Sequence, residues 1–472
     1  MSAAAPASGS WADVLAEGRL PRFALICLGV WLNAADSLIT ATIMPSVGRS
    51  LGGYPYFGWA TAGYLLGSVL AGASSGVLAL RFGLRGATAA AALLYAVGCA
   101  LSAGAPDIFS FLAGRILQGF GGGWVVGLCS VAISVLFANR LLPRVYSAIS
   151  SVWGIAVIVG PLMGGLLADT GSWRVVFWAF AVQGAAVAVA AWYMLPSAES
   201  GNQQAGVAWP QLGLIAGGVT LIALADVAGD FLLTALLTAA GVVLFVLTMR
   251  LDATSRVRLL PQGSSDLRTV HGAGYVTMFL LNAASMGLLV YGPAVLQTLR
   301  GLSALAAGYV VGAEALFWTA ASLPVAGLTG VWPGRMIRLG VVTIFAGLAL
   351  CAVVFDDSYL AWVIFAAGLI GCGFGLSWAF MSQGILGALA DEERAIGGAG
   401  IATVRLTGAA AGAAMVAAVA NLLGFAQGFT EPAARAAGVW VFVTVLPLAA
   451  LACVTSWRLG AVATVPSTSD SS

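Results

Sequence analysis

Four ionisable residues interrupt the long apolar runs of this sequence: Asp36, Arg115, Glu314 and Arg405. A charge at the centre of a membrane-spanning helix costs about 2.5–3.5 kcal/mol on insertion scales, so such residues usually face a cavity or a partner. A carboxyl group removed from water holds its proton more tightly and can exchange it when its surroundings change. An arginine stays charged, so Arg115 and Arg405 are expected to have structural or gating roles. The chemistry these residues indicate is proton exchange and cation binding.

Asp36 lies near the middle of the first apolar run, with Asn33 three residues before it and Thr40 four residues after it. In a helix these spacings place all three side chains on one face. A polar stripe among apolar neighbours predicts that this face lines an aqueous or protein interior, where Asp36 couples protons or binds substrate. The alternative is a neutral Asp36 that is hydrogen-bonded for packing alone.

Glu314 lies at the middle of a later apolar run, and Phe317 and Trp318 follow one turn further on. A carboxylate beside aromatic faces suits a hydrophobic cation, through ion pairing and cation–π attraction. The alternative is a salt bridge or hydrogen bond within the helix bundle. Further aromatic residues could line the same kind of apolar cavity, although core packing explains any one of them: Trp31, Trp124, Trp153 and Trp378.

The composition indicates that lipid is the main solvent of this chain. Of its 472 residues, 60% are apolar and 8% are charged, and the mean hydropathy is +0.99. A soluble domain carries roughly 25% charged residues. Continuous apolar runs such as 87–101 differ from the alternating segments of about 10 residues that form a membrane β-barrel. We therefore predict an all-α polytopic membrane protein.

Several function classes are disfavoured by the same residues. A net charge of +2 gives no reason to expect nucleic-acid binding. The six cysteines fall in apolar runs without a CxxC pair, and His271 is the only histidine. No metal site, cofactor site or catalytic triad can be assembled around them, so we do not expect an enzyme.

Apolar runs long enough to span a bilayer core, which needs roughly 20 residues, predict fourteen spans. The stretch 210–250 contains Asp226 and Asp230, which fit an external turn between two spans, 210–227 and 230–250. If this stretch were instead a surface or re-entrant segment, the chain would have twelve spans. The predicted spans are 22–46, 57–80, 86–104, 108–137, 146–168, 173–195, 210–227, 230–250, 272–298, 304–329, 338–355, 359–388, 396–424 and 436–457.

These spans predict five regions. The first two are an N-terminal cytoplasmic lead, 1–21, and a six-helix bundle, 22–195. A linker with the extra helix pair follows at 196–271. The last two are a second six-helix bundle, 272–457, and a C-terminal cytoplasmic tail, 458–472. Gly-rich stretches at corresponding positions of the two bundles indicate an internal duplication, as secondary transporters have: Gly114–Gly123 with Gly371–Trp378, and Gly154–Gly165 with Gly397–Gly412.

The arginines predict the orientation. With the N-terminus in the cytoplasm, fourteen arginines lie inside and four (Arg49, Arg174, Arg300 and Arg435) lie outside, which is a clear positive-inside bias. The lead shows no cleavable signal peptide, and the first apolar run is too long for a signal h-region. We expect a multi-pass protein of the inner or plasma membrane, monomeric, with both termini in the cytoplasm.

Several motifs resemble the major facilitator superfamily along the whole chain, specifically its fourteen-helix drug:proton antiporter branch. Asp36, nine residues before Pro45, resembles the first-helix motif of that branch. The resemblance gives two further motifs a coupling or gating role: Arg115, Gln118 and Gly119 are similar to the fourth-helix motif, and Gly160, Pro161, Gly164 and Gly165 are similar to the fifth-helix motif that marks exporters. Two further stretches lie where the family pattern leads one to expect them: Trp173-Arg174 and the segment from Pro293 to Gly308.

One motif departs from the family pattern. Gly76, Arg81 and Gly83 match the cytoplasmic loop motif, but Leu80 replaces its acidic residue. In the family that acidic residue helps to latch the cytoplasmic side, so its absence raises the question of how this side closes.

The hypothesis these observations favour is a secondary active transporter that exports hydrophobic or cationic drug-like compounds in exchange for protons. Its partners would be a small-molecule substrate, protons and the lipid bilayer. One alternative keeps the fold and exports a lipid or an endogenous metabolite. Another is a membrane sensor or scaffold without transport, although two costly midplane carboxylates, Asp36 and Glu314, speak against it.

Overall fold

The computed structural model describes residues 19–137, 141–196, 206–355 and 359–462. Within these ranges every regular element is a helix. The helices are α2 (Arg19–Leu51), η1 (Tyr54–Tyr56), α3 (Trp59–Ala103), α4 (Ile108–Leu136), α5 (Leu142–Asp169), α6 (Trp173–Met194), α7 (Trp209–Ala225), α8 (Phe231–Thr254), α9 (Val270–Arg300), α10 (Ala304–Val325), α11 (Trp332–Val354), α12 (Leu360–Gly387), η3 (Asp391–Glu393), α13 (Arg394–Leu422), η4 (Phe425–Gln427), α14 (Glu431–Val443) and α15 (Leu446–Val462).

Twelve helices in the described ranges are long and apolar enough to cross a membrane, and α7 is a shorter apolar helix. The all-α membrane fold is therefore confirmed, whereas the count of fourteen spans stays a prediction. Two predicted spans, 57–80 and 86–104, lie in the single helix α3, which is broken only at Gly83. The last predicted span, 436–457, lies across α14 and α15.

Gly83 interrupts α3 because its φ of 71° and ψ of 155° lie outside the helical region. A positive φ is open to glycine and unfavourable for residues with a Cβ atom. The neighbouring Arg81 is exposed at this break. The backbone conformation at this break therefore favours glycine at position 83. This explanation is independent of any role of the loop motif in closing the cytoplasmic side.

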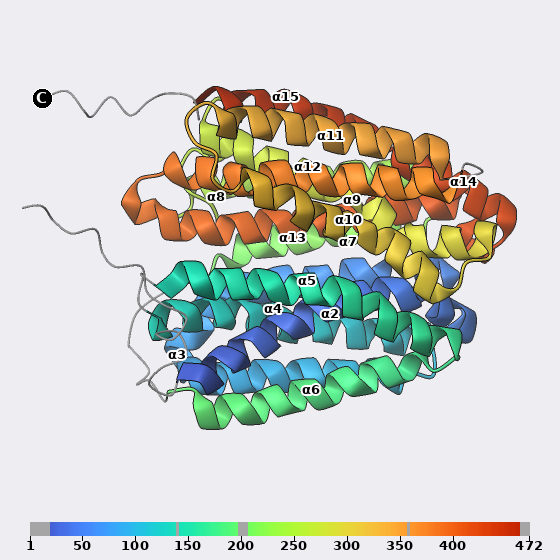
Figure 1. The fold of residues 1–472 in the computed structure, drawn as a ribbon, viewed down its shortest axis with the longest axis horizontal. Helices are drawn as coiled ribbons and strands as arrows, with labels where there is room; N and C mark the ends of the chain where they lie inside the picture. The colour runs from blue at the N-terminus through green and yellow to red at the C-terminus, as the bar shows by residue number, and fades with distance from the viewer. Residues whose placement is uncertain (1–18, 138–140, 197–205, 356–358, 463–472) are drawn as a thin grey trace, which may run out of the picture. The chain divides into compact units, whose positions relative to one another are not determined.

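The chain divides into two compact units. Unit 1 consists of residues 1–43 and 67–207, and unit 2 of residues 44–66 and 208–472. The boundary cuts α2 between Ile43 and Met44, next to Pro45 inside the helix. Within each unit the long helices run alongside one another (Figure 1). The predicted division into two bundles and a linker stays a prediction.

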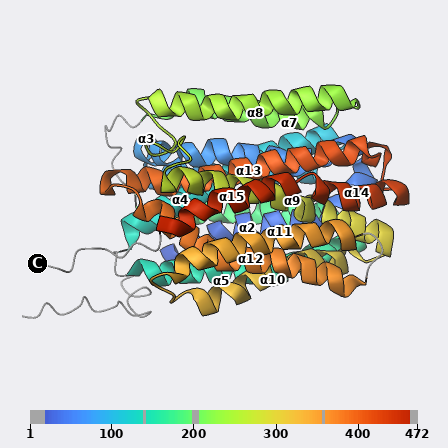
Figure 2. The same cartoon turned by 90° about the horizontal axis from the view of Figure 1, so that it is seen from above.

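Unit 2 contains the α7–α8 pair in addition to α9–α15. The two helices pack on each other, α7 packs on α13, and Figure 2 shows α7 and α8 side by side. Much of α8 is exposed, including Phe231, Leu232 and Leu236. Since these side chains are apolar, that face of α8 suits contact with lipid.

Glycines bring helices within each unit into close contact. In unit 1, a Cβ atom on Gly121 of α4 would run into the backbone of Tyr95 in α3, and one on Gly123 would run into the backbone of Ser68. In unit 2, a Cβ atom on Gly371 of α12 would run into the carbonyl oxygen of Glu314 in α10. Small residues permit this approach, which drives helix packing in lipid.

We expect Gly371→Ala to lower the stability of the protein by about 1–3 kcal/mol, because the added methyl group forces α10 and α12 apart. The measurement is unfolding of the purified protein in detergent. Gly387→Ala is the matched control in the same helix, because a Cβ atom there meets no atom within 4 Å. Equal unfolding of the two variants would contradict the close contact at Gly371.

Candidate functional site

Asp36 of α2 lies at the centre of a buried polar network in unit 1. Its side chain is 0% exposed, and that of Arg115 in α4 is 2% exposed. Arg115 Nη1 donates hydrogen bonds to Asp36 Oδ1 at 3.0 Å and Oδ2 at 3.1 Å. Gln118 Nε2 donates to the same Oδ1 at 2.8 Å, and Thr40 Oγ1 donates to it at 3.2 Å. Four of the predicted site residues therefore meet in one network.

A second layer of contacts fixes the donors. Arg115 Nη1 also donates to Gln118 Oε1 at 2.8 Å, and its guanidinium lies 5.9 Å from the ring centroid of Phe177 in α6. Gln118 Nε2 contacts the hydroxyl of Tyr95 in α3 at 3.4 Å. Tyr95 and Phe177 were not predicted to be site residues; the signal for Tyr95 was a hydroxyl in the middle of the apolar run 86–104.

The fifth-helix glycines hold α5 against α2 beside this network. A Cβ atom on Gly160 would lie 3.0 Å from the Leu38 side chain, and one on Gly164 would lie 3.0 Å from the Ile39 side chain. Pro161 and Gly165 are buried as well. Leu38 and Ile39 are two and three residues from Asp36, so the glycine face of α5 packs on the segment of α2 that presents the carboxylate.

The network defines what Asp36 can do chemically. Arg115 donates charge-assisted hydrogen bonds to the carboxyl group, and the amide of Gln118 and the hydroxyl of Thr40 donate to it as well. A proton and Arg115 therefore compete for the same carboxylate. Release of Arg115 would free Asp36 to bind a proton.

Glu314 of α10 is half-buried in unit 2, and among the described residues no hydrogen bond or ion pair reaches its side chain. Trp318, one turn further along α10, lies on the same face. Its ring stacks on Phe374 of α12, with centroids 4.9 Å apart and planes 10° apart, and lies 5.8 Å from Trp378. This carboxylate thus stands beside an aromatic stack without a counter-ion in the described structure.

Phe317 and Trp318 have different neighbours in the structure. Phe317 packs over Gly368, where a Cβ atom would lie 3.1 Å from its ring, and it is not part of the stack with Trp318. Phe374 takes that place; its signal in the sequence was its position four residues before Trp378 on one helix face.

The other predicted residues lie outside these two clusters. Trp31, Asn33 and Trp153 are half-buried in unit 1, and the hydroxyl of Ser37 donates to the carbonyl of Asn33 at 3.0 Å. The carbonyl of Gly119, the next residue after Gln118, accepts from Ser68 Oγ at 3.2 Å. Cavity-lining roles for these aromatic residues stay predictions.

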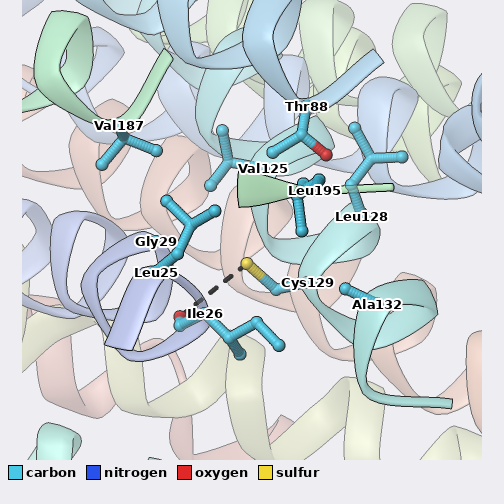
Figure 3. A pocket seen from close by; sticks show the side chains of 10 residues that line it. All are labelled: Leu25, Ile26, Gly29, Thr88, Val125, Leu128, Cys129, Ala132, Val187 and Leu195. Carbon is cyan, nitrogen blue, oxygen red and sulfur yellow. Dashed lines mark hydrogen bonds between the residues drawn. The ribbon is translucent and has the colours of Figure 1, made fainter. Parts of the chain in front are cut away.

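A small cavity in unit 1 is apolar apart from one hydroxyl (Figure 3). Its lining includes Gly29, Val125 and Cys129, and the only hydroxyl group in it is that of Thr88. Cys129 Sγ contacts the carbonyl of Ile26 at 3.8 Å. None of the Asp36 network residues lines this cavity, so it adds no chemistry to the site. In the described ranges no group of three or more histidine, cysteine or acidic residues converges on a metal position.

Similar proteins agree with this architecture. The chain is 29% identical over 468 residues to "Probable multidrug-efflux transporter Rv1634" of Mycobacterium tuberculosis, covering 95% of this chain and 96% of that protein. It is 24% identical over 425 residues to "Multidrug transporter protein MdtP" of Bacillus subtilis, covering 86% of this chain and 76% of the relative.

Solved structures with the same fold include a bacterial homologue of the human lysosomal transporter Spinster, with a TM-score of 0.67 and 12% identity over 96% of this chain and 98% of the other. A D-xylose–proton symporter matches with a TM-score of 0.60 and 16% identity over 91% and 97%. Residues 26–414 match the family model described as Major Facilitator Superfamily. Because that match covers most of the sequence and the relatives are transporters rather than enzymes, the chain belongs to the Major Facilitator Superfamily.

Proposed function

We propose that this transporter exports hydrophobic cations across the plasma membrane in exchange for protons, by alternating access. Glu314 carries the proposal: it is a half-buried carboxylate without a partner in the described residues, beside the Trp318–Phe374 stack. An ionisable residue inside a membrane-spanning helix is costly and is usually functional. A lipophilic cation would satisfy the carboxylate and lie against the aromatic faces.

The buried Asp36–Arg115 pair supports proton coupling. Arginine keeps its charge, so the carboxylate is the member of the pair that can take up a proton. In the proposed cycle, Arg115 swings away from Asp36 in one conformation and a proton from the outside replaces it. The proton leaves when the pair reforms. The chain is oriented with both termini in the cytoplasm, as the arginine distribution predicts.

The names of the relatives also support a drug-like cargo, since two of them are described as multidrug transporters. Export in place of import is supported by the resemblance of Gly160, Pro161, Gly164 and Gly165 to the exporter motif. A lipid or metabolite cargo would use the same fold, and the binding experiment below separates it from a cationic one.

We expect Trp318→Ala to weaken binding of tetraphenylphosphonium by about 0.5–2 kcal/mol, which is the size of a cation–π contact and is roughly a twofold to thirtyfold rise in Kd. Binding is measured by equilibrium dialysis with the purified protein. Trp362→Ala is the matched control, because Trp362 is a tryptophan of α12 that is 51% exposed. No saturable binding to the wild type, or equal losses in both variants, would argue against a cation site at Trp318.

A further inference from the structure

A second buried carboxyl group lies in unit 2, away from Glu314. Asp226 follows the last residue of α7 and begins the turn to α8, and it is 3% exposed. Asp230, four residues later in the same turn, is exposed and caps α8 by accepting a hydrogen bond from the Leu233 amide at 2.8 Å. Two aspartates of one turn therefore have opposite environments.

Asn421, near the end of α13, binds Asp226 and a third segment at once. Its Nδ2 donates to the carbonyl of Pro55 at 2.7 Å, to the carbonyl of Asp226 at 3.0 Å and to Asp226 Oδ1. Pro55 lies in η1, in the part of the α2–α3 connection that belongs to unit 2. Trp59 adds a bond from its Nε1 to the carbonyl of Ala223 at 3.0 Å. We call this arrangement the Asn421 clasp.

An aromatic cluster is formed by residues that neighbour the clasp in the sequence: Tyr54 and Phe57 near Pro55, and Phe425 and Phe429 after Asn421. Tyr291 of α9 packs on Phe57 with centroids 5.4 Å apart and on Phe425 with centroids 5.0 Å apart. Phe429 packs on Phe425 at 5.1 Å and on Tyr54 at 4.8 Å. Asp226 itself is 3% exposed, and in such a buried position an unpaired charge is expensive.

The charges around Asp226 do not compensate for an anion. No ion pair reaches Asp226 within the described residues, and α7 and α13 both end beside it, so the negative ends of two helix dipoles meet there. Titratable or charged side chains do occur on the surrounding elements, but none of them bonds to Asp226: Arg49, Tyr54, Tyr56, Asp230, Tyr291, Arg300, Glu431 and Arg435.

Three oxygen atoms in this region are buried without a hydrogen-bond partner among the described residues: Asp226 Oδ2, Asn421 Oδ1 and the Tyr291 hydroxyl. A carboxylate with an unsatisfied buried oxygen carries a large desolvation cost, whereas a carboxylic acid loses the charge and gains a donor. A metal ion is the weaker alternative, because the amide nitrogen of Asn421 already lies among the oxygens that would bind it.

We propose that Asp226 is a proton-binding site, separate from Asp36 and Glu314, and that its neutral form keeps the Asn421 clasp closed on the Met44–Leu66 segment. Ionisation would place an uncompensated charge at a buried position, so loss of the proton favours opening of the clasp. This inference does not depend on the cargo proposed above.

Burial raises the pKa of Asp226 well above its ordinary value of 3.8, and the hydrogen bond from Asn421 opposes part of that rise. A raised folded-state pKa means that stability is fully present below pH 3.8 and is lost as the pH rises toward the folded-state value. Asp226→Asn removes this dependence. We therefore expect the unfolding temperature of Asp226→Asn to exceed that of the wild type at neutral pH and to converge with it near pH 3.8.

Asp230→Asn is the matched control: it is expected to show no pH-dependent gain in unfolding temperature, because asparagine caps a helix as well as aspartate does.

Infrared difference spectroscopy gives the second readout. We expect a carbonyl stretch of a protonated carboxylic acid at neutral pH that is lost in Asp226→Asn and kept in Asp230→Asn. An Asp226→Asn protein that is less stable than the wild type, or an unchanged band, would overturn the proposal. So would a band that disappears when sodium chloride replaces choline chloride, since that indicates an alkali cation. Neither the unfolding temperature nor the infrared band requires transport. A negative result in these two measurements therefore counts against the Asp226 site alone and not against the proposed function.

Discussion

Asp36→Asn is expected to destabilise the protein by about 3–5 kcal/mol, because it removes the negative charge that neutralises the buried Arg115 guanidinium. Asp36 accepts both hydrogen bonds that anchor Arg115 Nη1 to α2, at 3.0 Å and 3.1 Å. A neutral acceptor such as Gln118 Oε1, which accepts from Arg115 Nη1 at 2.8 Å, cannot neutralise the charge. The free energy of unfolding, measured in detergent with a denaturant series, checks this expectation.

Two further variants decide whether the buried pair is the cause. Arg115→Gln in the Asp36→Asn background removes the buried positive charge and should restore most of the stability, while transport stays absent. Glu431→Gln breaks the exposed pair of Glu431 with Arg435, whose side chains are 68% and 42% exposed, and should change stability by about 0–1 kcal/mol. An Asp36→Asn protein that is as stable as Glu431→Gln would contradict a charged buried pair.

Glu314→Gln is expected to behave in the opposite way, with unchanged or slightly increased stability and a loss of cation binding. The side chain has no partner in the described structure, so its neutralisation leaves no charge behind. Losing the interaction of a charge with its ligand removes about 1.5–3 kcal/mol, roughly a tenfold or larger rise in the Kd of tetraphenylphosphonium. Equilibrium dialysis and unfolding in detergent measure the two effects on the same preparations.

Glu392→Gln is the control for Glu314→Gln, since Glu392 lies exposed in η3. It should leave both the Kd and the stability unchanged. Unaltered cation binding by Glu314→Gln would remove the carboxylate from the binding site. A strong loss of stability in that variant would instead show that Glu314 has a structural partner.

Helix periodicity was sufficient to find the main parts of the unit 1 network. Asp36 and Thr40 share a helix face, as do Arg115 and Gln118, because residues three and four apart are neighbours on a helix. The bond between the two faces joins residues 79 positions apart. Only tertiary packing determines that contact, so the sequence alone indicates Asp36 and Arg115 as two separate charges.

The aromatic cluster shows a similar limit. The spacing of Trp318 from Glu314 indicated a carboxylate with an aromatic neighbour, but the stacking partner, Phe374, comes from α12. Phe317 adjoins Trp318 in the sequence and nevertheless packs over Gly368. Adjacent residues on a helix point in different directions, and a choice between them requires the position of the neighbouring helix.

The turn between α7 and α8 was expected from Asp226 and Asp230 around a glycine, and a turn is present there. The opposite environments of the two aspartates could not be expected. Asn421, which binds Asp226, lies 195 positions away, and nothing in the local sequence distinguishes a buried aspartate from an exposed one. Similarly, hydropathy identified spans 57–80 and 86–104 but not the single-residue break at Gly83 that separates them.

The measurement that tests the central claim most directly is proton movement driven by a lipophilic cation in proteoliposomes. A pH-sensitive dye inside the vesicles reports protons while tetraphenylphosphonium is added outside, for the wild type, Glu314→Gln and the Asp36→Asn/Arg115→Gln double variant. The account predicts proton flux in the wild type that requires the cation and is lost in both variants, with Glu392→Gln unaffected. Cation transport without proton movement, or equal proton flux in the double variant, would contradict coupling through Asp36.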